Sequence, residues 1–211
     1  DATRRVDARR PAPVARLGDR VHVGAARAGG RIHVGDLALH ELKRADRLIA
    51  DLLSYSGQLQ LQCSPVPLKP LVQSIVSQQD WQGVQCVLQV PEGLTVYADS
   101  YRLQQVLINL LDNALAFCRN QPDAKICLAS RQDQHQLLLY VHNNGPAIAT
   151  SQQASLFQPF VSKRTGGSGL GLAIVRRIMQ AHGGQISYRS DLGWPVSFEL
   201  QFNQPQDIEH G

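Results

Sequence analysis

The residues with the clearest chemical potential form a glycine-rich stretch, GGSGLG at 166–171, which leads directly into an apolar helical sequence. Glycine has no Cβ, so its backbone N–H groups can approach a ligand closely. A helix that begins here directs its free N–H groups and the positive end of its dipole at that ligand. The ligand is therefore expected to be an anion, most simply a polyphosphate. The stretch is neither a Walker A loop, because it lacks Gly-Lys-Ser/Thr, nor a dinucleotide fingerprint, because no βαβ-type strand precedes it.

Two asparagines, Asn109 and Asn113, form a second candidate group. They stand four residues apart in a stretch, 99–118, whose apolar spacing and leading Asp99 predict a long capped helix, so both lie on one helix face. Asparagine is a poor helix former, which makes two on an inner face unusual. An amide oxygen is a good ligand for Mg²⁺, which usually arrives with the phosphates of a nucleotide. A pair of ordinary, hydrogen-bonded helix asparagines is the alternative.

Three further stretches lie between this helix and the glycines. Strand-like residues 136–142 run into the turn sequence NNGPAI at 143–148. The sequence LFQPF at 156–160 places two aromatic residues around a proline, for which core packing is the alternative explanation. Lys163 and Arg164 come just before the glycines and carry charges suited to neutralising phosphate.

The remaining elements must position these groups. Apolar residues at three- and four-residue steps predict an amphipathic helix over 36–56, whose seam requires a partner helix. Further helices are expected at 67–79, 151–156 and 169–182, with strands at 86–90, 95–98, 125–129, 136–142, 185–189 and 196–202. This order predicts an α+β fold, a mixed β-sheet covered on one face by helices.

The composition excludes several other classes of protein. Hydrophobic residues make up 43% of the 211 positions, as in a globular protein, and no apolar run is long enough for a membrane span. Residues 1–31 hold eight arginines but no aromatic residue to stack on bases, so specific nucleic-acid binding is not expected. The four cysteines form no C-x-x-C pair, which favours reduced thiols in a cytoplasmic setting over a zinc site or disulfides.

These elements, in this order, resemble the ATP-binding catalytic domain of the bacterial sensor histidine kinases of two-component systems. QVLINLLDNALAF is similar to the N box, VHNNGPAIA to the G1 box, LFQPF to the F box and GGSGLGLAIV to the G2 box. The sequence LKRADRLIADLLSYSGQL resembles the second helix of the dimerisation and phosphotransfer hairpin. The resemblance covers roughly residues 37–203 and implies a histidine kinase/gyrase-type ATPase sandwich preceded by a helical dimerisation segment.

The resemblance also implies roles for individual residues. Asn113 would bind Mg²⁺, assisted by Asn109, and Asn143 would face the adenine. The other nucleotide contacts would come from Gly145, Ala147, Phe157, Phe160, Lys163, Gly167, Ser168, Gly169, Leu170 and Gly171. Of these, the phenylalanines would anchor the lid that closes over the nucleotide, while the lysine and the glycines would hold phosphates. Related hydrolytic ATPases have a glutamate base in place of Asn109, so phosphoryl transfer is favoured here over hydrolysis.

Three positions depart from the family pattern. Asn143 stands in place of an aspartate that accepts the adenine amino proton, and Ala147 in place of a glycine. Ala116 stands where many members have a basic residue, for which Arg119 is the nearest substitute. The phosphate and metal groups are intact, and charged contacts to phosphate dominate such sites, so ATP binding is still expected.

The phosphoacceptor is the part of the family pattern that this sequence matches least. The family motif is a histidine followed by an acidic, an apolar and a basic residue, with a proline further on. The nearest match begins at His40 but lacks the proline, and it lies in the predicted second helix of the hairpin instead of the first. An exposed helix histidine is the alternative interpretation of His40.

We therefore predict three regions: an atypical, poorly ordered segment over 1–35, a dimerisation helix over 36–57 and an ATP-binding catalytic domain over 58–211. The predicted activity is that of a protein-histidine kinase, which uses Mg-ATP to phosphorylate a histidine and relays the phosphoryl group to a response regulator. The predicted assembly is a cytoplasmic homodimer formed through residues 37–56, with any membrane attachment in an N-terminal part outside this sequence. A degenerate nucleotide-binding or dimerisation module, and a serine/threonine kinase or ATPase on the same fold, are the alternatives.

Overall fold

The computed structural model describes residues 42, 45–46, 48–49, 51–53, 55–57, 59–132, 136–162 and 167–203. The described residues between 42 and 56 are helical. The later elements are β1 (Ser64–Pro67), α2 (Leu68–Ser77), β2 (Gln85–Gln89), β3 (Thr95–Ala98), α3 (Ser100–Cys118), β4 (Lys125–Gln132), β5 (Gln136–Asn143), α4 (Thr150–Gln153), α5 (Gly171–Ala181), β6 (Gln185–Arg189) and β7 (Val196–Asn203). The predicted segment 1–35, the candidate phosphoacceptor His40 and the candidate phosphate ligand Lys163 lie outside the described residues.

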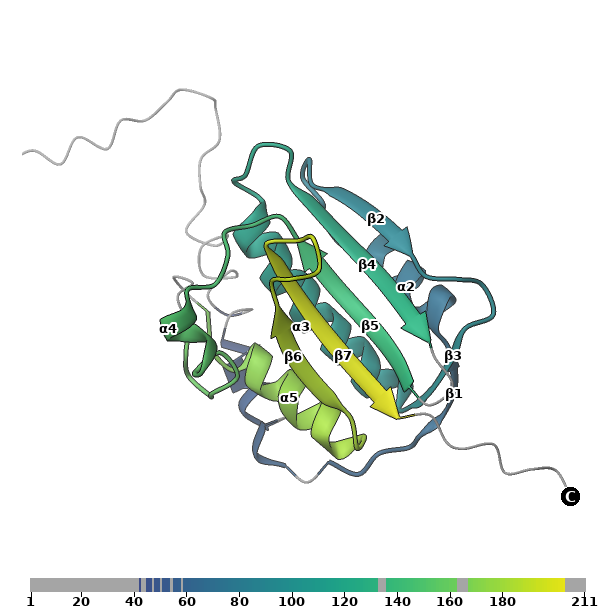
Figure 1. Ribbon diagram of the computed structural model, residues 1–211. Helices are drawn as coiled ribbons and strands as arrows, with labels where there is room; N and C mark the ends of the chain where they lie inside the picture. Colours follow the sequence, from purple (N-terminus) through teal and green to yellow (C-terminus); the bar gives the residue numbers. More distant parts are fainter. Residues whose placement is uncertain are drawn as a thin grey trace, which may run out of the picture. The chain divides into compact units, whose positions relative to one another are not determined.

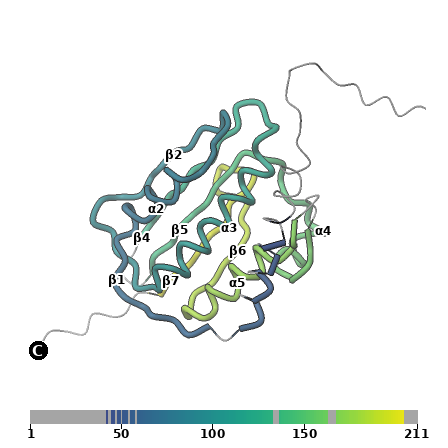
Figure 2. Tube along the Cα trace, turned by 180° about the vertical axis from the view of Figure 1, so that it is seen from behind, coloured from purple at the N-terminus to yellow at the C-terminus, as the bar shows by residue number. Residues whose placement is uncertain are grey.

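Five strands form one mixed sheet in the order β2-β4-β5-β7-β6. β2 runs parallel to β4, whereas all other neighbours in this sheet are antiparallel. A parallel pair needs a crossover connection, and this one contains α3. α2, α3 and α5 lie on one face of the sheet, as Figures 1 and 2 show from opposite sides. The predicted α+β fold, with a mixed sheet and helices on one face, is confirmed.

The strands predicted at 86–90 and 95–98 are present as β2 and β3, but they belong to different sheets. β3 pairs antiparallel with β1 in a separate two-stranded sheet, in which Ser64 lies opposite Ala98. The sequence predicts no strand at β1, because its four residues, SPVP, include two prolines and show no clear apolar alternation. Val96 and Ala98 of β3 are fully buried, so packing against the core holds this pair in place.

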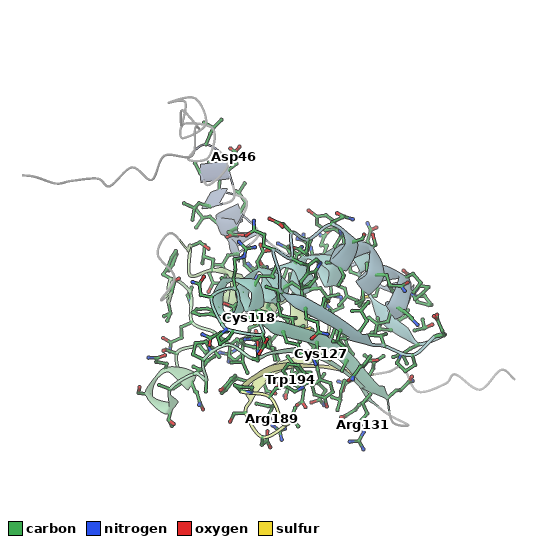
Figure 3. The ribbon with its side chains drawn as sticks, turned by 90° about the horizontal axis from the view of Figure 1, so that it is seen from above. Asp46, Cys118, Cys127, Arg131, Arg189 and Trp194 are labelled. Carbon is green, nitrogen blue, oxygen red and sulfur yellow. The ribbon has the colours of Figure 1, made fainter. Side chains whose placement is uncertain are left out.

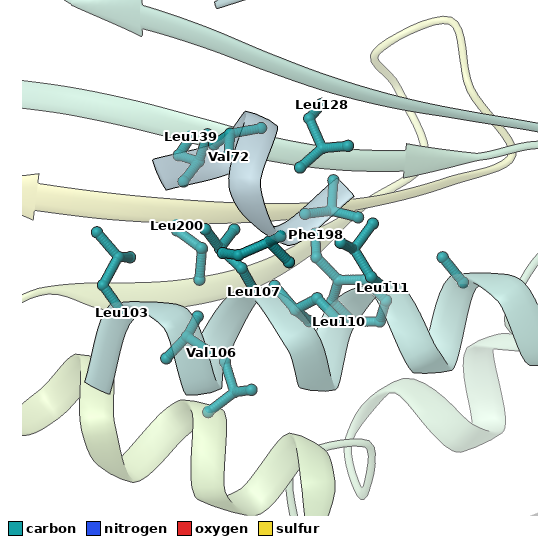
Figure 4. Close-up of a cluster of buried hydrophobic side chains, with 14 of the residues drawn as sticks. Val72, Leu103, Val106, Leu107, Leu110, Leu111, Leu128, Leu139, Phe198 and Leu200 are labelled. Atoms are coloured by element: carbon teal, nitrogen blue, oxygen red, sulfur yellow. The ribbon is translucent and has the colours of Figure 1, made fainter. Parts of the chain in front are cut away.

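α3 is positioned by its cap and by its apolar face. Asp99 precedes the helix and accepts a hydrogen bond from the backbone N–H of Arg102 at 3.0 Å, as expected for an N-cap. Figure 4 shows Leu103, Leu107, Leu110 and Leu111 of this helix beside Leu128, Leu139, Phe198 and Leu200 of the sheet. Full burial of each such side chain stabilises the fold by about 1.5–3 kcal/mol. This burial determines which side of α3 remains for Asn109 and Asn113.

α5 packs beside α3, and His182 joins the end of one helix to the start of the other. The Nε2 atom of His182 accepts a hydrogen bond from the backbone N–H of Asp99 at 3.0 Å. The Nδ1 atom lies 2.8 Å from the carbonyl oxygen of Ile178, so the consistent tautomer carries its proton on Nδ1. The two helices are thus linked at the end of α5 that is remote from the glycine-rich stretch.

The face of the sheet away from the helices carries an aromatic stack. The ring of His142 lies between those of Tyr140 and Trp194, with centroid separations of 5.3 and 5.5 Å. Its Nδ1 atom lies 2.7 Å from Ser197 Oγ, and burial lowers the pKa of the imidazole. Figure 3 shows Trp194 on this face. The neutral His142 ring is therefore a structural part of the sheet.

Candidate functional site

The asparagine face of α3 lies against the glycine-rich stretch. Asn109 and Asn113 are both half-buried and share a helix face. A Cβ built on Gly171 would lie 3.6 Å from Asn109 Oδ1, which is ordinary van der Waals contact. An amide oxygen therefore stands beside the first residue of α5, as expected if the two motifs form one site. Asn113 follows one turn further along α3.

The first turn of α5 offers free backbone donors at the same place. Leu170 is the N-cap residue, and no side chain among the described residues caps the helix there. Its own side chain is 2% exposed and packs into the core, which fixes the start of the helix. The first N–H groups of an α-helix have no partner within the helix and carry a partial positive charge. The N-terminus of α5 is therefore suited to an anion.

Gly169 brings the LFQPF segment against the glycine-rich stretch. Its φ is +68°, and a Cβ at this position would lie 2.6 Å from the carbonyl carbon of Phe160 and 2.8 Å from the nitrogen of Val161. Only glycine satisfies both the left-handed backbone and the close approach. The F-box and G2-box sequences are therefore in contact through their backbones.

The two phenylalanines of this segment differ from each other. Phe157 packs against the core, with its ring edge-on to Phe198 at a centroid distance of 6.3 Å. The side chain of Phe160 is 67% exposed, and the residue has a φ of 64°. Phe157 thus contacts the core through its side chain, whereas Phe160 contacts Gly169 through its backbone.

The end of β5 places Asn143 and Gly145 beside the C-terminal end of α3. Asn143 is 1% exposed and pairs with Ile126 on one side and Val196 on the other. A Cβ on Gly145 would lie 2.7 Å from Asn143 Nδ2 and 3.0 Å from the carbonyl oxygen of Phe117. The glycine therefore permits a close approach between this turn and α3.

The turn after β5 is held by Asn144, which sequence analysis overlooks. Its Oδ1 atom accepts hydrogen bonds from the backbone N–H of Lys125 at 2.8 Å and from Cys118 Sγ. Its Nδ2 atom donates to the carbonyl oxygen of Asp123 at 2.8 Å. The Asn-Asn-Gly sequence is a turn signal, but it does not reveal which of the two asparagines holds the turn through its side chain. Ala147 is exposed and lacks a positive φ, so this backbone needs no glycine there.

The helical segment at 42–56 also reaches the glycine-rich stretch. The hydroxyl of Ser168 donates a hydrogen bond to Asp51 Oδ2 at 3.0 Å. Ser168 Oγ in turn accepts a hydrogen bond from the backbone N–H of Leu170 at 3.2 Å. The guanidinium of Arg177 lies 5.7 Å from the ring centre of Tyr55. It also donates to the carbonyl oxygen of Gly57. No signal in the sequence links Asp51 to Ser168.

Two other expectations concern charge. Arg119, the nearest substitute for a missing basic residue, donates to the carbonyl oxygen of Asp80 at 3.2 Å and so points to the turn between α2 and β2. Across the described ranges, no group of three or more His, Cys, Asp or Glu side chains could hold a metal ion. A metal would therefore depend on the amides of α3 together with a ligand that brings its own oxygens.

No helix in the described ranges is long and apolar enough to cross a bilayer.

The residues fit a phosphate-bearing ligand with a polar planar group. The N-terminus of α5 offers N–H donors that no described side chain caps, and these donors lie beside the amide oxygen of Asn109. Gly145 and Gly169 remove side chains where a Cβ would clash. The buried Asn143 Nδ2 has no hydrogen-bond partner in the described part of the chain. The comparison with known families agrees with this chemistry: residues 98–206 match the family of histidine kinase-, DNA gyrase B-, and HSP90-like ATPases. The chain belongs to this family.

Individual relatives within this ATPase family are sensory or histidine kinases. The chain is 33% identical over 179 residues to the adaptive-response sensory kinase SasA of Synechococcus elongatus, a match that covers 78% of the chain and 46% of SasA. The histidine kinase AdeS of Acinetobacter baumannii aligns with a TM-score of 0.69 and 26% identity over 84% of this chain and 87% of that one. The histidine kinase ThkA, in a complex with the response regulator protein TrrA, aligns with a TM-score of 0.66 and 26% identity over 82% and 51%. The chain carries the ATP-binding catalytic domain of a sensor histidine kinase, and it spans less than half the length of the first curated relatives it matches.

Proposed function

We propose that this chain is the catalytic region of a sensor histidine kinase that binds Mg-ATP and transfers the γ-phosphoryl group to a histidine. The observation that carries the proposal is the position of Asn109 Oδ1 beside Gly171, the first residue of the uncapped helix α5. An acceptor for a metal and a set of donors for an anion converge there. This combination suits a triphosphate that carries Mg²⁺.

Different residues would bind the metal, the phosphates and the base of the nucleotide. Asn113, assisted by Asn109, would hold Mg²⁺, which neutralises phosphate charge when it is bound. The backbone of Gly167, Gly169, Leu170 and Gly171, the hydroxyl of Ser168 and the ammonium of Lys163 would hold the phosphates. The base would lie at the end of β5, between Asn143, Gly145 and Ala147. Phe157 and Phe160 would position the segment that closes over the nucleotide.

The domain has no nucleophile of its own in this scheme. A nitrogen of the acceptor imidazole forms a bond to the γ-phosphorus, and the bond from that phosphorus to the bridging oxygen of ADP breaks. Positioning and charge neutralisation supply most of the catalysis for such a transfer. Asn109 is an amide and accepts no proton from water, so it does not promote hydrolysis. His40, or a histidine of another chain, is the proposed acceptor.

The helical segment supplies the proposed dimer contact. Its large apolar side chains at Leu42, Ile49, Leu52 and Leu53 are between 50% and 65% exposed, and their steps of three and four residues place them on one face. An apolar seam of this kind is buried when two helices pair. A second copy of this chain, paired through residues 37–56, is the proposed occupant. The complex of ThkA with TrrA supports a response regulator as the further partner.

Asn113→Ala tests the proposed activity. The chain is titrated with Mg-ATP by calorimetry, and phosphorylation is followed with radiolabelled γ-phosphate. We expect Asn113→Ala to bind Mg-ATP at least about tenfold more weakly and to lose autophosphorylation, because the metal loses its protein ligand. The control is Asn120→Ala, which removes an exposed amide beyond the end of α3.

Each alternative gives a different result. No saturation by millimolar nucleotide in the unaltered chain indicates a degenerate module. Label that survives acid but not base indicates phosphorylation of a hydroxyl, whereas the opposite pattern indicates phosphohistidine. Full activity of Asn113→Ala contradicts the proposed role of this residue in metal binding.

A further inference from the structure

The side chain of Asn143 carries a buried hydrogen-bond donor that has no partner among the described residues. The residue is 1% exposed, and its Nδ2 atom makes no hydrogen bond within the part of the chain that the structure describes. A buried donor left unpaired costs about 1–3 kcal/mol. Such groups are rare in native proteins, and each requires an explanation, of which a missing ligand is one.

The backbone around Asn143 holds this donor in place. The residue is the last of β5 and pairs with both neighbouring strands, opposite Ile126 and Val196. Its Nδ2 atom lies 2.7 Å from the position that a Cβ on Gly145 would take. The lack of a side chain on Gly145 therefore allows the amide of Asn143 to lie against this turn. The donor lies beside the turn that follows β5, close to the C-terminal end of α3. The proposed function locates the base of the nucleotide there.

The chemistry of an amide at this place differs from that of a carboxylate. An ionised carboxylate only accepts hydrogen bonds, so it pairs with the 6-amino group of adenine and repels the 6-oxygen of hypoxanthine or guanine. An amide offers two N–H donors as well as an acceptor. A 6-oxopurine supplies the acceptor that Asn143 Nδ2 lacks. Adenine pairs with the same amide through its oxygen, after rotation of the side chain.

We propose that the amide of Asn143 admits 6-oxopurine nucleotides alongside adenine nucleotides. This inference rests on the proposed nucleotide-binding function. It defines the class of phosphoryl donor as the purine nucleoside triphosphates, with either adenine or a 6-oxopurine as the base.

The test compares ATP with inosine triphosphate, which isolates the change at the 6-position. Calorimetric titrations of the full chain in Mg²⁺ give the ratio of the dissociation constants, inosine triphosphate over ATP. We expect a ratio below about ten for the unaltered chain. We expect the ratio to rise at least about tenfold in Asn143→Asp, because a carboxylate opposite a 6-oxygen leaves two acceptors facing each other.

The control is Asn203→Asp, which makes the same amide-to-carboxylate change at the exposed far end of β7 and should leave the ratio unaltered. A ratio above about ten in the unaltered chain overturns this role of the Asn143 amide, whether or not Asn143→Asp folds. An unaltered ratio in a folded Asn143→Asp overturns it as well. Those two results leave the proposed kinase function intact. The absence of binding by both nucleotides overturns the proposed function and this inference together.

Discussion

The hydroxyl of Ser168 donates a hydrogen bond to the carboxylate of Asp51 at 3.0 Å, across a separation of 117 positions in the chain. Ser168 belongs to the stretch that is proposed to hold phosphates, and Asp51 belongs to the helical segment before the catalytic domain. A carboxylate at this hydroxyl occupies a donor that a phosphate oxygen would use. Asp51 and a bound phosphate would therefore compete for this donor.

Asp51→Ala should strengthen nucleotide binding. Removal of the carboxylate frees the Ser168 hydroxyl and removes a negative charge near the phosphates, so the dissociation constant of Mg-ATP should fall by about three- to tenfold. Calorimetry on the full chain measures the change. Asp46→Ala, at an exposed position of the same segment that is labelled in Figure 3, is the control and should have no effect. Equal or weaker binding by Asp51→Ala contradicts competition between this carboxylate and phosphate.

Gly169→Ala should weaken nucleotide binding far more than a similar change elsewhere. Both Gly169 and Gly193 have a positive φ, of 68° and 76°. A Cβ at Gly169 would lie 2.6 Å from the backbone of Phe160, whereas a Cβ at Gly193 meets nothing within 4 Å. Each alanine costs about 1–2 kcal/mol for its backbone conformation. Only Gly169→Ala also separates the glycine-rich stretch from the LFQPF segment.

We therefore expect Gly169→Ala to raise the dissociation constant of Mg-ATP at least about tenfold, and Gly193→Ala to leave it unaltered. Urea unfolding, followed by circular dichroism, shows whether both variants remain folded. Equal effects of the two substitutions on binding would show that the close approach between Gly169 and Phe160 has no role in the site.

The exposed apolar seam of the helical segment should hold a dimer together. Ile49 and Leu53, four residues apart, are 57% and 65% exposed. The double substitution Ile49→Glu with Leu53→Glu would bring like charges together in a paired seam, so the chain should elute as a monomer. Size-exclusion chromatography with light scattering measures the mass. Leu192→Glu, at a 36% exposed leucine in the loop before β7, is the control. A monomeric mass for the unaltered chain would exclude this dimer.

The buried ring of His142 should make the stability of the domain depend on pH. Burial lowers the pKa of this imidazole in the folded state below its usual value of 6.5. Above about pH 7 the ring is neutral in both states, so stability is complete. As the pH falls below 6.5, the unfolded chain binds a proton that the folded chain does not, and the free energy of unfolding decreases. The decrease ends once the pH falls below the folded-state pKa.

Urea unfolding at about pH 7.5 and pH 5.5 measures this effect. The loss of stability between the two values should be smaller in His142→Gln, in which position 142 no longer titrates. The charged Lys125, which lies 5.9 Å from the ring centre of the neighbouring Trp194, remains in both proteins. An equal pH dependence in the two proteins would show that His142 does not contribute to it.

Much of the local structure follows from residues close together in the chain. The spacing of leucines and valines predicts α3, and Asp99 predicts its beginning, because helix periodicity and capping act within a few residues. β6 has the predicted bounds, Gln185–Arg189, and α5 begins two residues inside the predicted stretch 169–182. The α+β class follows from the order of these elements.

Which groups come together depends on packing between distant parts of the chain. The types and spacing of Asn109, Asn113 and the glycines indicate a metal and an anion, and this chemistry belongs to the sequence by itself. The tertiary structure decides that Asn109 lies beside Gly171, that Asn143 is buried with a donor unpaired among the described residues and that Asp51 contacts Ser168. These contacts depend on the burial of the apolar face of α3 against the sheet and on the pairing of β5 between β4 and β7, and no local pattern encodes the partner across such distances.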